Sequence, residues 1–436
     1  MKAVNVGVLG LGTVGGGVVN VLKRNATEIS RRAGREIIVT RASARDLSRE
    51  RICDTKGIEL TTTPADIIND PEIDIVLELI GGTSLAKDLV LQAIDNGKHV
   101  VTANKALIAL HGNEIFAKAS EKGVMVLFES AVAGGIPIVK AIREGLSGNQ
   151  IEWLAGIING TGNFILTEMR DKGRDFADVL AEAQALGYAE ADPTFDVEGI
   201  DAGHKLAILA SLAFGIPLQF DKVFTEGITK VTRADVEYAE ELGYRIKHLG
   251  IARKTEQGIE LRVHPTLIPH RRLIANVDGV MNAILVQGDA VGPTLYYGAG
   301  AGAEPTASAV ISDVVDIVRV LTGDPEHRVP HLAFQEDAIS DIPVLAAEQI
   351  KTAYYLRLSA EDKPGVLADV THILAKHNIS IEALIQKEPL EGNTTLPVIM
   401  LTQTTLEKEM NAAIAEIEAL PTITGSVSRI RLETLG

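Results

Sequence analysis

The sequence predicts a mixed α/β protein in which a doubly wound parallel sheet is followed by an α+β domain and a small C-terminal α+β domain. Strand-like and helix-like hydrophobic patterns alternate from residue 4 to residue 128. A glycine-rich turn joins the first strand to the first helix. From Tyr354 to Leu432 the pattern becomes strand, helix, two strands, helix, strand. These three observations predict the fold class.

Length and composition limit the classes of function. A chain of 436 residues is too long for one core and predicts two or three domains. The formal net charge of -16 disfavours nucleic acid or an anionic membrane as a partner. The single Cys53 excludes an internal disulfide framework and fits a reducing compartment. No run of about 18 apolar residues suggests a membrane span, and the N-terminus lacks a signal-peptide cleavage site. We therefore expect a cytoplasmic globular protein.

The first element is a short apolar, β-branched run, Val4 to Leu9, which predicts a strand. It meets the motif Gly-Leu-Gly-Thr-Val-Gly at 10–15, after which apolar residues recur at helical spacing. In this context the glycines allow a tight turn and a close approach to a pyrophosphate, which the helix N-terminus attracts. The motif predicts a Rossmann dinucleotide site that comprises Gly10, Gly12, Thr13, Val14 and Gly15. The alternative is an ordinary strand–helix turn.

The next elements continue the alternation. Strands are predicted at 36–40, 73–79, 98–102 and 124–128, and helices at 88–96 and 108–122. Parallel strands with right-handed crossovers follow from this order.

The end of the second strand bears on the choice of cofactor. An acid there would hold the ribose of NAD, whereas arginine suits the 2′-phosphate of NADP. The sequence offers Arg41 and Arg45, and its first acid is the later Asp46. We favour NADP, with NAD tolerated; the alternative is that both arginines are solvated loop residues. Lys105 follows the strand 98–102 and lies at the ligand-binding edge or is simply solvated.

Two loops beyond the first domain are candidates for binding. Residues 129–137 place a carboxylate, Glu129, before a small glycine-rich turn whose carbonyls could bind a hard cation or merely link two domains. A strand predicted at 153–158 ends in a polar turn that presents Thr161 to a small polar substrate or caps the helix that begins near Phe164.

The most informative stretch is residues 187–205, where five acids fall between 190 and 201. Asp201 and Lys205 share one face of a helix. On an exposed helix this would be an ordinary salt bridge, but the apolar run through Ala213 indicates burial, which makes the pair a site candidate. A lysine beside a carboxylate can deliver a proton to the alkoxide that hydride transfer creates. We read His204 as structural.

A second glycine-rich loop, 297–308, opens a helix predicted from about 305 to 321 with Pro305 in its first turn. Its small backbone could pass close to a cofactor or substrate, or only lead the chain back to the first domain.

Taken together and in order, these motifs resemble the homoserine dehydrogenase family over residues 1–325. The segments that carry the resemblance are GLGTVG, TANKAL, ESAVAGGIPI, GIINGTGNFIL, GYAEADPTFDVEGIDAGHK and YGAGAGAEPTASAV. The resemblance implies hydride exchange between L-homoserine and L-aspartate 4-semialdehyde with a nicotinamide cofactor. It also implies a monovalent cation, sodium, at the 129–136 loop.

The resemblance assigns roles to individual residues. Lys205 matches the lysine of proton transfer, and Lys105 matches a lysine near the cofactor that is also discussed for that role. The substrate residues are Asp201, Asp196, Glu190 and Thr161. Glu190, Gly187 and Gly302 are placed near the cofactor. The cation ligands are Glu129 and the carbonyls of Val132, Gly134 and Ile136.

The C-terminal pattern, with Asp-Lys-Pro-Gly-Val-Leu at its first turn, resembles an ACT domain, a ferredoxin-like fold that often binds amino acids. The resemblance implies L-threonine as an effector and a homodimer or homotetramer; the alternative is a domain that only forms an oligomer interface. The expected division is a dinucleotide-binding domain at 1–130, a substrate and dimerisation domain at 131–325, a linker at 326–352 and the ACT domain at 353–432.

Two rival functions remain at this point. One is a non-catalytic amino-acid sensor, against which the Asp201 to Lys205 face argues. The other is a dehydrogenase of a related semialdehyde or amino acid. The choice between Lys105 and Lys205 as proton donor also stays open.

Overall fold

The computed structural model describes residues 2–325, 328–387 and 395–436. Residues 326 and 327 of the expected linker and 388–394 of the expected ACT domain lie outside the described residues. The chain forms two compact units: unit 1 holds 1–154, 204–221 and 281–342, and unit 2 holds 155–203, 222–280 and 343–436. The expected domain at 131–325 is thus divided between the units, because the chain passes between them several times.

Unit 1 contains a six-stranded sheet in which every pair of neighbours is parallel. In spatial order its strands are β3 (Glu59–Thr61), β2 (Ile37–Ser43), β1 (Val4–Leu9), β4 (Ile75–Glu78), β5 (His99–Thr102) and β6 (Val126–Leu127). The order reverses direction between β1 and β4, and open sheets of this kind bind ligands at the carboxyl ends of the strands beside such a reversal. The doubly wound sheet predicted from the sequence is confirmed.

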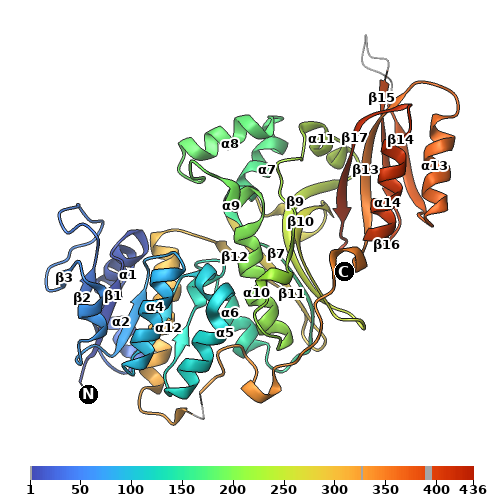
Figure 1. The fold of residues 1–436 in the computed structure, drawn as a ribbon. Helices are drawn as coiled ribbons and strands as arrows, with labels where there is room; N and C mark the ends of the chain where they lie inside the picture. The colour runs from blue at the N-terminus through green and yellow to red at the C-terminus, as the bar shows by residue number, and fades with distance from the viewer. Residues whose placement is uncertain (1, 326–327, 388–394) are drawn as a thin grey trace. The chain divides into compact units, whose positions relative to one another are not determined.

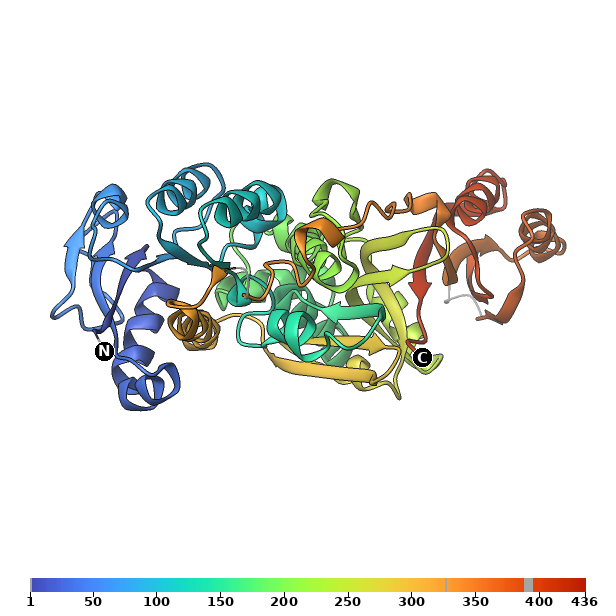
Figure 2. The ribbon, with the colours of Figure 1, turned by 90° about the horizontal axis from the view of Figure 1, so that it is seen from below.

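Helices cover both faces of this sheet. They are α1 (Thr13–Arg24), α2 (Ala26–Ala33), α3 (Pro64–Ile68), α4 (Ser84–Asp95), α5 (Lys105–Glu121) and α12 (Ala303–Val320). Figures 1 and 2 show α12 beside α1 on one face and α4 beside α5 on the other. The contact of α1 with α12 needs Gly17, because a Cβ there would lie 2.5 Å from the carbonyl oxygen of Ala303. The final helix of the 131–325 region therefore packs on the first helix of the chain.

Several element boundaries differ from those predicted. The second strand continues to Ser43, because it pairs with β3 as well as β1, and Arg41 consequently lies inside it. The strand expected at 124–128 is only Val126–Leu127. Helix α5 begins at Lys105, since the side chain of Asn104 accepts a hydrogen bond from the amide of Leu107. Helix α4 begins at Ser84, four residues before the predicted start.

Two elements carry the chain across the unit boundary, β7 (Ile151–Ile157) and α10 (Ile200–Phe214). The rest of unit 1 includes the short helix α6 (Ile138–Lys140) and an antiparallel hairpin of β11 (Met281–Gly288) and β12 (Gly292–Ala299).

Unit 2 contains a mixed sheet in which β9, β10, β17, β13, β15 and β14 follow one another, with β8 against β10 and β16 against β13. The strands are β8 (Phe224–Thr225), β9 (Tyr244–Lys254), β10 (Ile259–Pro269), β13 (Lys351–Glu361), β14 (Ile381–Gln386), β15 (Thr395–Thr402), β16 (Thr405–Leu406) and β17 (Ile423–Leu432). The helices are α7 (Gly160–Lys172), α8 (Phe176–Ala185), α9 (Thr194–Val197), α11 (Arg233–Glu241), α13 (Val366–Lys376) and α14 (Glu407–Glu418). The strand and helix order predicted for the C-terminal domain is confirmed.

The last strand, β17, joins the strands of the C-terminal domain to β10 in the same sheet. β17 pairs with β13 in antiparallel and with β10 in parallel, opposite Thr266 and Leu267. Beside this junction Arg431, which is fully buried, donates to Glu407 over 2.5 Å and to Glu226 over 3.2 Å. Arg262 is also fully buried and donates to Glu433 over 2.5 Å. A buried ion-pair cluster, defined by these five charged residues, therefore spans the junction within unit 2.

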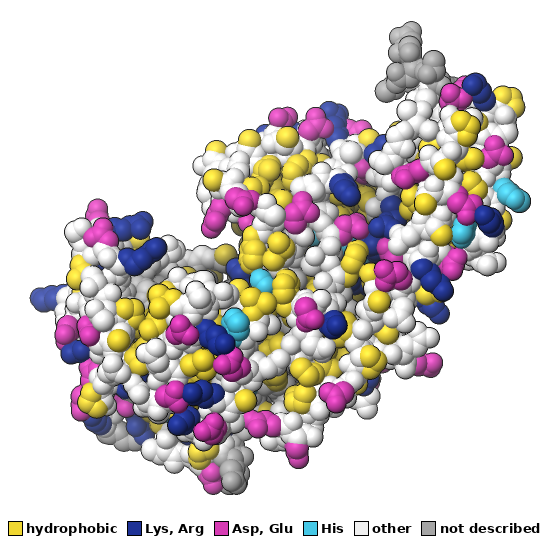
Figure 3. All heavy atoms as spheres, viewed as in Figure 1, with side chains coloured by type: hydrophobic (Ala, Val, Ile, Leu, Met, Phe, Trp, Pro, Cys, Tyr) yellow, Lys and Arg dark blue, Asp and Glu magenta, His cyan; other side chains and the backbone are white. Residues whose placement is uncertain are grey.

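The surface agrees with the composition. On the visible faces of both units, side chains of either charge are interspersed without a continuous basic patch (Figure 3). Among the described residues, no helix combines the length and the apolar character that crossing a bilayer requires.

Candidate active site

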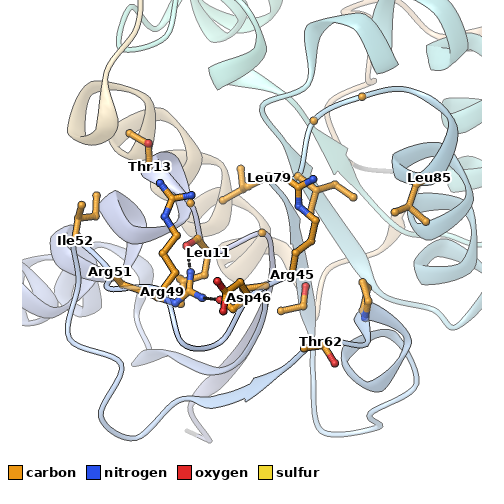
Figure 4. A pocket seen from close by; sticks show the side chains of 18 of the residues that line it. Leu11, Thr13, Arg45, Asp46, Arg49, Arg51, Ile52, Thr62, Leu79 and Leu85 are labelled. Atoms are coloured by element: carbon orange, nitrogen blue, oxygen red, sulfur yellow. Dashed lines mark hydrogen bonds between the residues drawn. The ribbon is translucent and has the colours of Figure 1, made fainter. Parts of the chain in front are cut away.

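A pocket of about 700 Å³ opens at the carboxyl edge of the unit 1 sheet (Figure 4). Four segments line it: the glycine-rich turn at 10–13, the loop after β2, the turn from β3 into α3 with Thr62 and Pro64, and the loop after β4. Its lining residues include Gly10, Gly12, Thr13, Ser43, Arg45, Asp46, Arg49, Arg51, Leu79, Ile80, Gly81, Gly82 and Leu85. This is the position in which a doubly wound sheet binds a dinucleotide.

The predicted glycines have distinct tasks. Gly10 has a φ of 98°, and a Cβ there would lie 2.7 Å from the carbonyl oxygen of Leu79. Gly12 caps α1 and borders the pocket. A Cβ on Gly15 would lie 2.3 Å from the carbonyl oxygen of Gly10, so this third glycine permits the helix to pack on the turn. Val14 lies against the hydrophobic core and not in the pocket lining.

The loop after β2 supplies three arginines. Arg51 donates to the carbonyls of Leu11, over 2.7 Å, and Asp46, over 2.5 Å, and so ties this loop to the glycine-rich turn. Arg45 and Arg49 also line the pocket, and Figure 4 shows both side chains extended from the loop. Within the part of the chain that the structure describes, neither guanidinium makes an ion pair or hydrogen bond. Two cations therefore remain available for an anionic ligand.

Arg41 is placed differently from the prediction. Its guanidinium lies 2.9 Å from Glu59 and 3.0 Å from Asp70, and it does not line the pocket. The strand extends past Arg41, which turns this side chain toward the neighbouring β3 and α3. We therefore remove Arg41 from the candidate cofactor set. Asp46 accepts from the amide and the hydroxyl of Ser48, and the hydroxyl bond is the main reason that its pKa is lowered.

Lys105 is the first residue of α5, three residues after the carboxyl end of β5. The preceding Asn104 donates from its side chain to the carbonyl of Gly82 over 2.6 Å. Because Gly82 lines the pocket, the start of α5 is joined to the pocket by a hydrogen bond.

The loop predicted to bind a cation also lies in unit 1. Both carboxylate oxygens of Glu129 accept backbone hydrogen bonds, from Val139 over 2.9 Å and from Lys140 over 2.8 Å. Burial, followed by repulsion from Asp313, raises the pKa of Glu129 to about 7. Ala133 and Gly134 adopt positive φ angles of 55° and 49°. This loop contacts the second glycine-rich loop, since the amide of Gly135 donates to the carbonyl of Ala299 over 3.0 Å.

Gly302, predicted to lie near the cofactor, is the N-cap of α12 and has a φ of 126°. A Cβ at that position would lie 3.2 Å from the ring of Pro305. Only glycine therefore suits this entry into the helix.

Unit 2 gathers two of the predicted substrate residues around one amide. The side-chain nitrogen of Asn159 donates to Asp196 and to Asp201, each over 2.8 Å. The oxygen of the same amide caps α7 by accepting from Gly162 over 2.7 Å. Asp201 is 2% exposed. Two carboxylates that converge on a neutral donor form an acidic centre suited to an ammonium group.

The remaining unit 2 candidates lie near this centre in sequence. Thr161, in the first turn of α7, donates to the carbonyl of Tyr188 over 2.7 Å. Gly187 has a φ of 77° and ends α8. The side chain of Glu190 is exposed, while its carbonyl accepts from Gln184 over 3.0 Å. The structure thus brings Asp196 and Asp201 together and leaves Glu190 on the surface of its unit.

The helix α10 carries Asp201 and Lys205 one turn apart. Their exposed fractions are 2% and 8%, so the pair is buried and is no ordinary surface salt bridge. His204 on the same helix packs on the ring of Phe220, with 4.1 Å between centroids.

The comparisons with known proteins agree with this arrangement. A model described as the homoserine dehydrogenase NAD-binding domain matches residues 10–129, a homoserine dehydrogenase model matches 137–315, and an ACT-domain model matches 354–421. The homoserine dehydrogenase of Pseudomonas aeruginosa is 67% identical to this chain over 435 residues, which is 100% of both proteins. The chain belongs to the homoserine dehydrogenase family.

Solved homoserine dehydrogenases extend the similarity to the fold. The enzyme from Thiobacillus denitrificans is 67% identical, with a TM-score of 0.95 over 100% of this chain and 99% of that one. A hyperthermophilic archaeal homoserine dehydrogenase in complex with NADPH is 25% identical, with a TM-score of 0.60 over 74% of this chain and 99% of that one. The predicted enzyme class is confirmed: the chain is an oxidoreductase that interconverts L-homoserine and L-aspartate 4-semialdehyde with a nicotinamide cofactor. The sensor and the other dehydrogenases are excluded.

Several residues of the site were missed by the sequence analysis. Arg49 and Arg51 lie six and eight residues beyond the end of β2, too far along the loop for the strand-end rule to indicate them. Asn159 belonged to a noted polar turn, but its two carboxylate partners lie 37 and 42 residues away. Glu78 lies inside the strand predicted at 73–79, and no neighbouring residue marks it as part of a site.

Proposed function

We propose that this homoserine dehydrogenase uses NADP in preference to NAD, with Arg45 and Arg49 binding the 2′-phosphate. The observation that supports this is that both guanidinium groups lie in the lining of the pocket without an ion-pair partner among the described residues. The turn at 10–13 and the start of α1 fit the pyrophosphate, because backbone N–H groups converge there. Asp46 also lines the pocket, which leaves room for NAD at lower affinity.

The test of this proposal is an assay that follows the absorbance of the reduced nicotinamide ring with homoserine and either cofactor. We expect kcat/KM to be higher with NADP. Equal or higher kcat/KM with NAD would contradict the proposal.

We further propose that Lys205 handles the proton of the reaction. A nicotinamide bound in the pocket would exchange a hydride with the carbon of the substrate. Lys205 then donates a proton to the oxygen during reduction and takes one up during oxidation. Its burial one helical turn from Asp201 supports this role, because charged groups are costly to bury and cluster where a site requires them. Lys105 is assigned to cofactor contact at the start of α5.

The acidic centre of unit 2 is the proposed site of the substrate ammonium. Asp196 and Asp201 supply negative charge, and Asn159 holds both carboxylates in position. Thr161 and Glu190 complete the proposed set, and Gly187 and Gly302 are assigned to the loops beside the cofactor.

The loop at 129–136 is the proposed site of a monovalent cation, sodium. Val132 and Gly134 are buried residues, and neither carbonyl accepts a hydrogen bond from any described residue. Buried carbonyls need a partner, and a cation provides one. With Glu129 and the carbonyl of Ile136 the donor set is mostly neutral oxygen, which fits one positive charge better than two. Thermal unfolding in sodium and in choline chloride tests this, and an identical Tm in both salts would argue against the site.

The ACT domain is proposed to bind L-threonine at the turn that precedes α13. Gly365 caps this helix with a φ of 95°, a conformation that other residues adopt with strain. Gly365→Ala should therefore weaken inhibition by threonine while the uninhibited rate is kept. Wild-type sensitivity in this variant, or no inhibition of the wild type, would count against the proposal. A truncation before β13 is a poorer test, because it would also remove β17 from β10.

The protein is proposed to assemble as a homodimer or homotetramer in the cytoplasm. Val291 and Tyr297 of the β11–β12 hairpin are 49% and 58% exposed, which supports a further contact on that hairpin. The single cysteine fits a reducing compartment. Light scattering coupled to gel filtration measures the assembly, and a monomeric mass at micromolar concentration would contradict it.

A further inference from the structure

Glu78, at the end of β4, is a fully buried carboxylate next to the pocket of unit 1. Its Oε1 accepts hydrogen bonds from the amides of Ile80, over 3.1 Å, and Gly81, over 3.2 Å. Its Oε2 accepts from the hydroxyl of Thr102 over 2.6 Å. Burying a carboxylate is costly, so three donors converging on one such group indicate a specific task.

The first two donors fix the loop that follows β4. Gly81 and Gly82 adopt φ angles of 73° and 74°, a turn of two successive left-handed residues that glycine alone adopts readily. The same loop presses on the glycine-rich turn, where a Cβ on Gly10 would lie 2.7 Å from the oxygen of Leu79 and 2.9 Å from Ile80. The carboxylate of Glu78 therefore sets one wall of the pocket and the space available to Gly10.

The third donor extends the network to the start of α5. Besides donating to Glu78, the hydroxyl of Thr102 accepts from the amide of Asn104 over 3.0 Å. Asn104 in turn donates to the carbonyl of Gly82 over 2.6 Å and caps α5 by accepting from Leu107 over 3.1 Å. The hydrogen bonds thus form a ring that links Glu78, Thr102, Asn104 and the 79–82 loop. Asn104 is the residue before Lys105.

We propose that Glu78 is a positioning residue for the reaction, which holds the 79–82 loop and the first turn of α5 in the geometry that cofactor binding requires. This inference rests on the proposed cofactor site in unit 1. A carboxylate suits the task because it only accepts hydrogen bonds and so can serve all three donors. A glutamine of the same shape must turn its NH₂ group toward one of them.

The test uses Glu78→Gln and Thr102→Val in the full-length protein, with His99→Gln as the matched control. His99 lies at the opposite end of β5 from Thr102 and is also buried, where it accepts a hydrogen bond from the amide of Met125 over 2.9 Å. We expect each site variant to raise the cofactor KM about 10-fold, the factor that corresponds to one misplaced buried hydrogen bond. The control should keep the wild-type KM even if its Tm falls.

The double variant Glu78→Gln/Thr102→Val sharpens the test. Because both residues act through one network, its KM should be no higher than that of the worse single variant. Wild-type cofactor KM in both single variants, measured well below their Tm, would overturn the proposal and leave Glu78 a stabilising residue. If Glu78→Gln does not fold, Thr102→Val and Asn104→Ala decide by the same criterion.

Lys105→Ala separates this inference from the roles proposed above. A raised cofactor KM in Glu78→Gln beside an unchanged kcat and KM in Lys105→Ala would remove Lys105 from the site and keep Glu78 as the organiser of the pocket wall. An unchanged cofactor KM in Glu78→Gln beside a lowered kcat or a raised KM in Lys105→Ala would keep Lys105 in the site and reject the positioning role of Glu78.

Discussion

The pocket of unit 1 and the ion-pair cluster of unit 2 are built from different materials. The lining of the pocket combines glycine-rich turns with loop side chains, and it comes from four short segments within the first 85 residues. The cluster is made of charged side chains whose partners lie far apart in sequence, 205 residues in the case of Arg431 and Glu226. The first is a local motif that a sheet presents, whereas the second exists only because β17 returns to β10.

The two regions also differ in what a substitution does to them. The loop arginines of the pocket can change with little effect on folding, because they lie on a loop at the edge of a sheet. A buried ion pair adds little net stability, but removing one partner leaves an uncompensated charge inside the protein. Burial alone would raise the pKa of Glu433, yet Arg262 and Arg253 hold it below its usual value. Variants in the pocket should therefore alter catalysis, and variants in the cluster should alter stability.

The largest effect is expected at Lys205, on the helix that passes from unit 2 to unit 1. Lys205→Ala should lower kcat by about 10²- to 10⁴-fold, the usual contribution of a proton-transfer group. The pocket of unit 1 does not include this residue, so cofactor affinity, measured by fluorescence titration, should remain. A kcat within twofold of wild type, about 0.4 kcal/mol in the barrier, would remove Lys205 from its proposed role.

The second effect concerns the cluster. Arg431→Met should reduce the free energy of unfolding by about 3–5 kcal/mol, because Glu407 and Glu226 lose the cation between them. Urea denaturation measures this change. The matched control is Arg233→Ala, which breaks an exposed pair with Glu237 and should cost about 0.5 kcal/mol or less. Equal losses of unfolding free energy in the two variants would show that the buried cluster contributes no more to stability than an exposed ion pair.

The third prediction is a loss of stability in acid that arises in unit 1. Burial lowers the pKa of His99 and of His331 from 6.5 to about 4. Each ring accepts a backbone hydrogen bond, from Met125 and from Val126, and cannot do so once both nitrogens are protonated.

The sign follows from linkage. The unfolded chain takes up protons on these histidines below about pH 6.5, whereas the folded chain does so only near pH 4. Stability is therefore complete above pH 6.5 and falls through this window, by up to about 3 kcal/mol for each histidine. His99→Gln, which keeps an acceptor and does not titrate, should make the denaturation midpoint less dependent on pH. An unchanged slope would contradict the assignment for His99.

The smallest effect is expected at the loop arginines. Arg49→Ala should lower kcat/KM for NADP about 10-fold, the loss of one charge-assisted contact, and leave the value for NAD nearly unchanged. Arg41→Ala serves as the control, since that guanidinium lies on Glu59 and Asp70 and not in the pocket. A larger shift of cofactor preference in Arg41→Ala than in Arg49→Ala would return Arg41 to the candidate cofactor site.

The sequence by itself determined the fold class, the glycine-rich turn, the family and the ACT-like pattern, because each is written in adjacent residues or in local hydrophobic period. It also indicated that Asp201 and Lys205 would be buried, from the apolar run around them. Local spacing placed Arg41 just beyond the second strand, whereas β2 continues to Ser43 and contains it. The length of β2 depends on its pairing with β3, which no neighbouring residue reveals.

The tertiary structure alone decided which side chains meet. Asn159 reaches two aspartates, Glu78 joins the loop after β4 to the start of α5, and Arg431 bridges acids from two distant segments. The physical reason is that hydrogen bonds and ion pairs act over about 3 Å, and long-range contacts of that precision exist only after the strands have paired. Local patterns select the elements, and the pairing of those elements selects the partners.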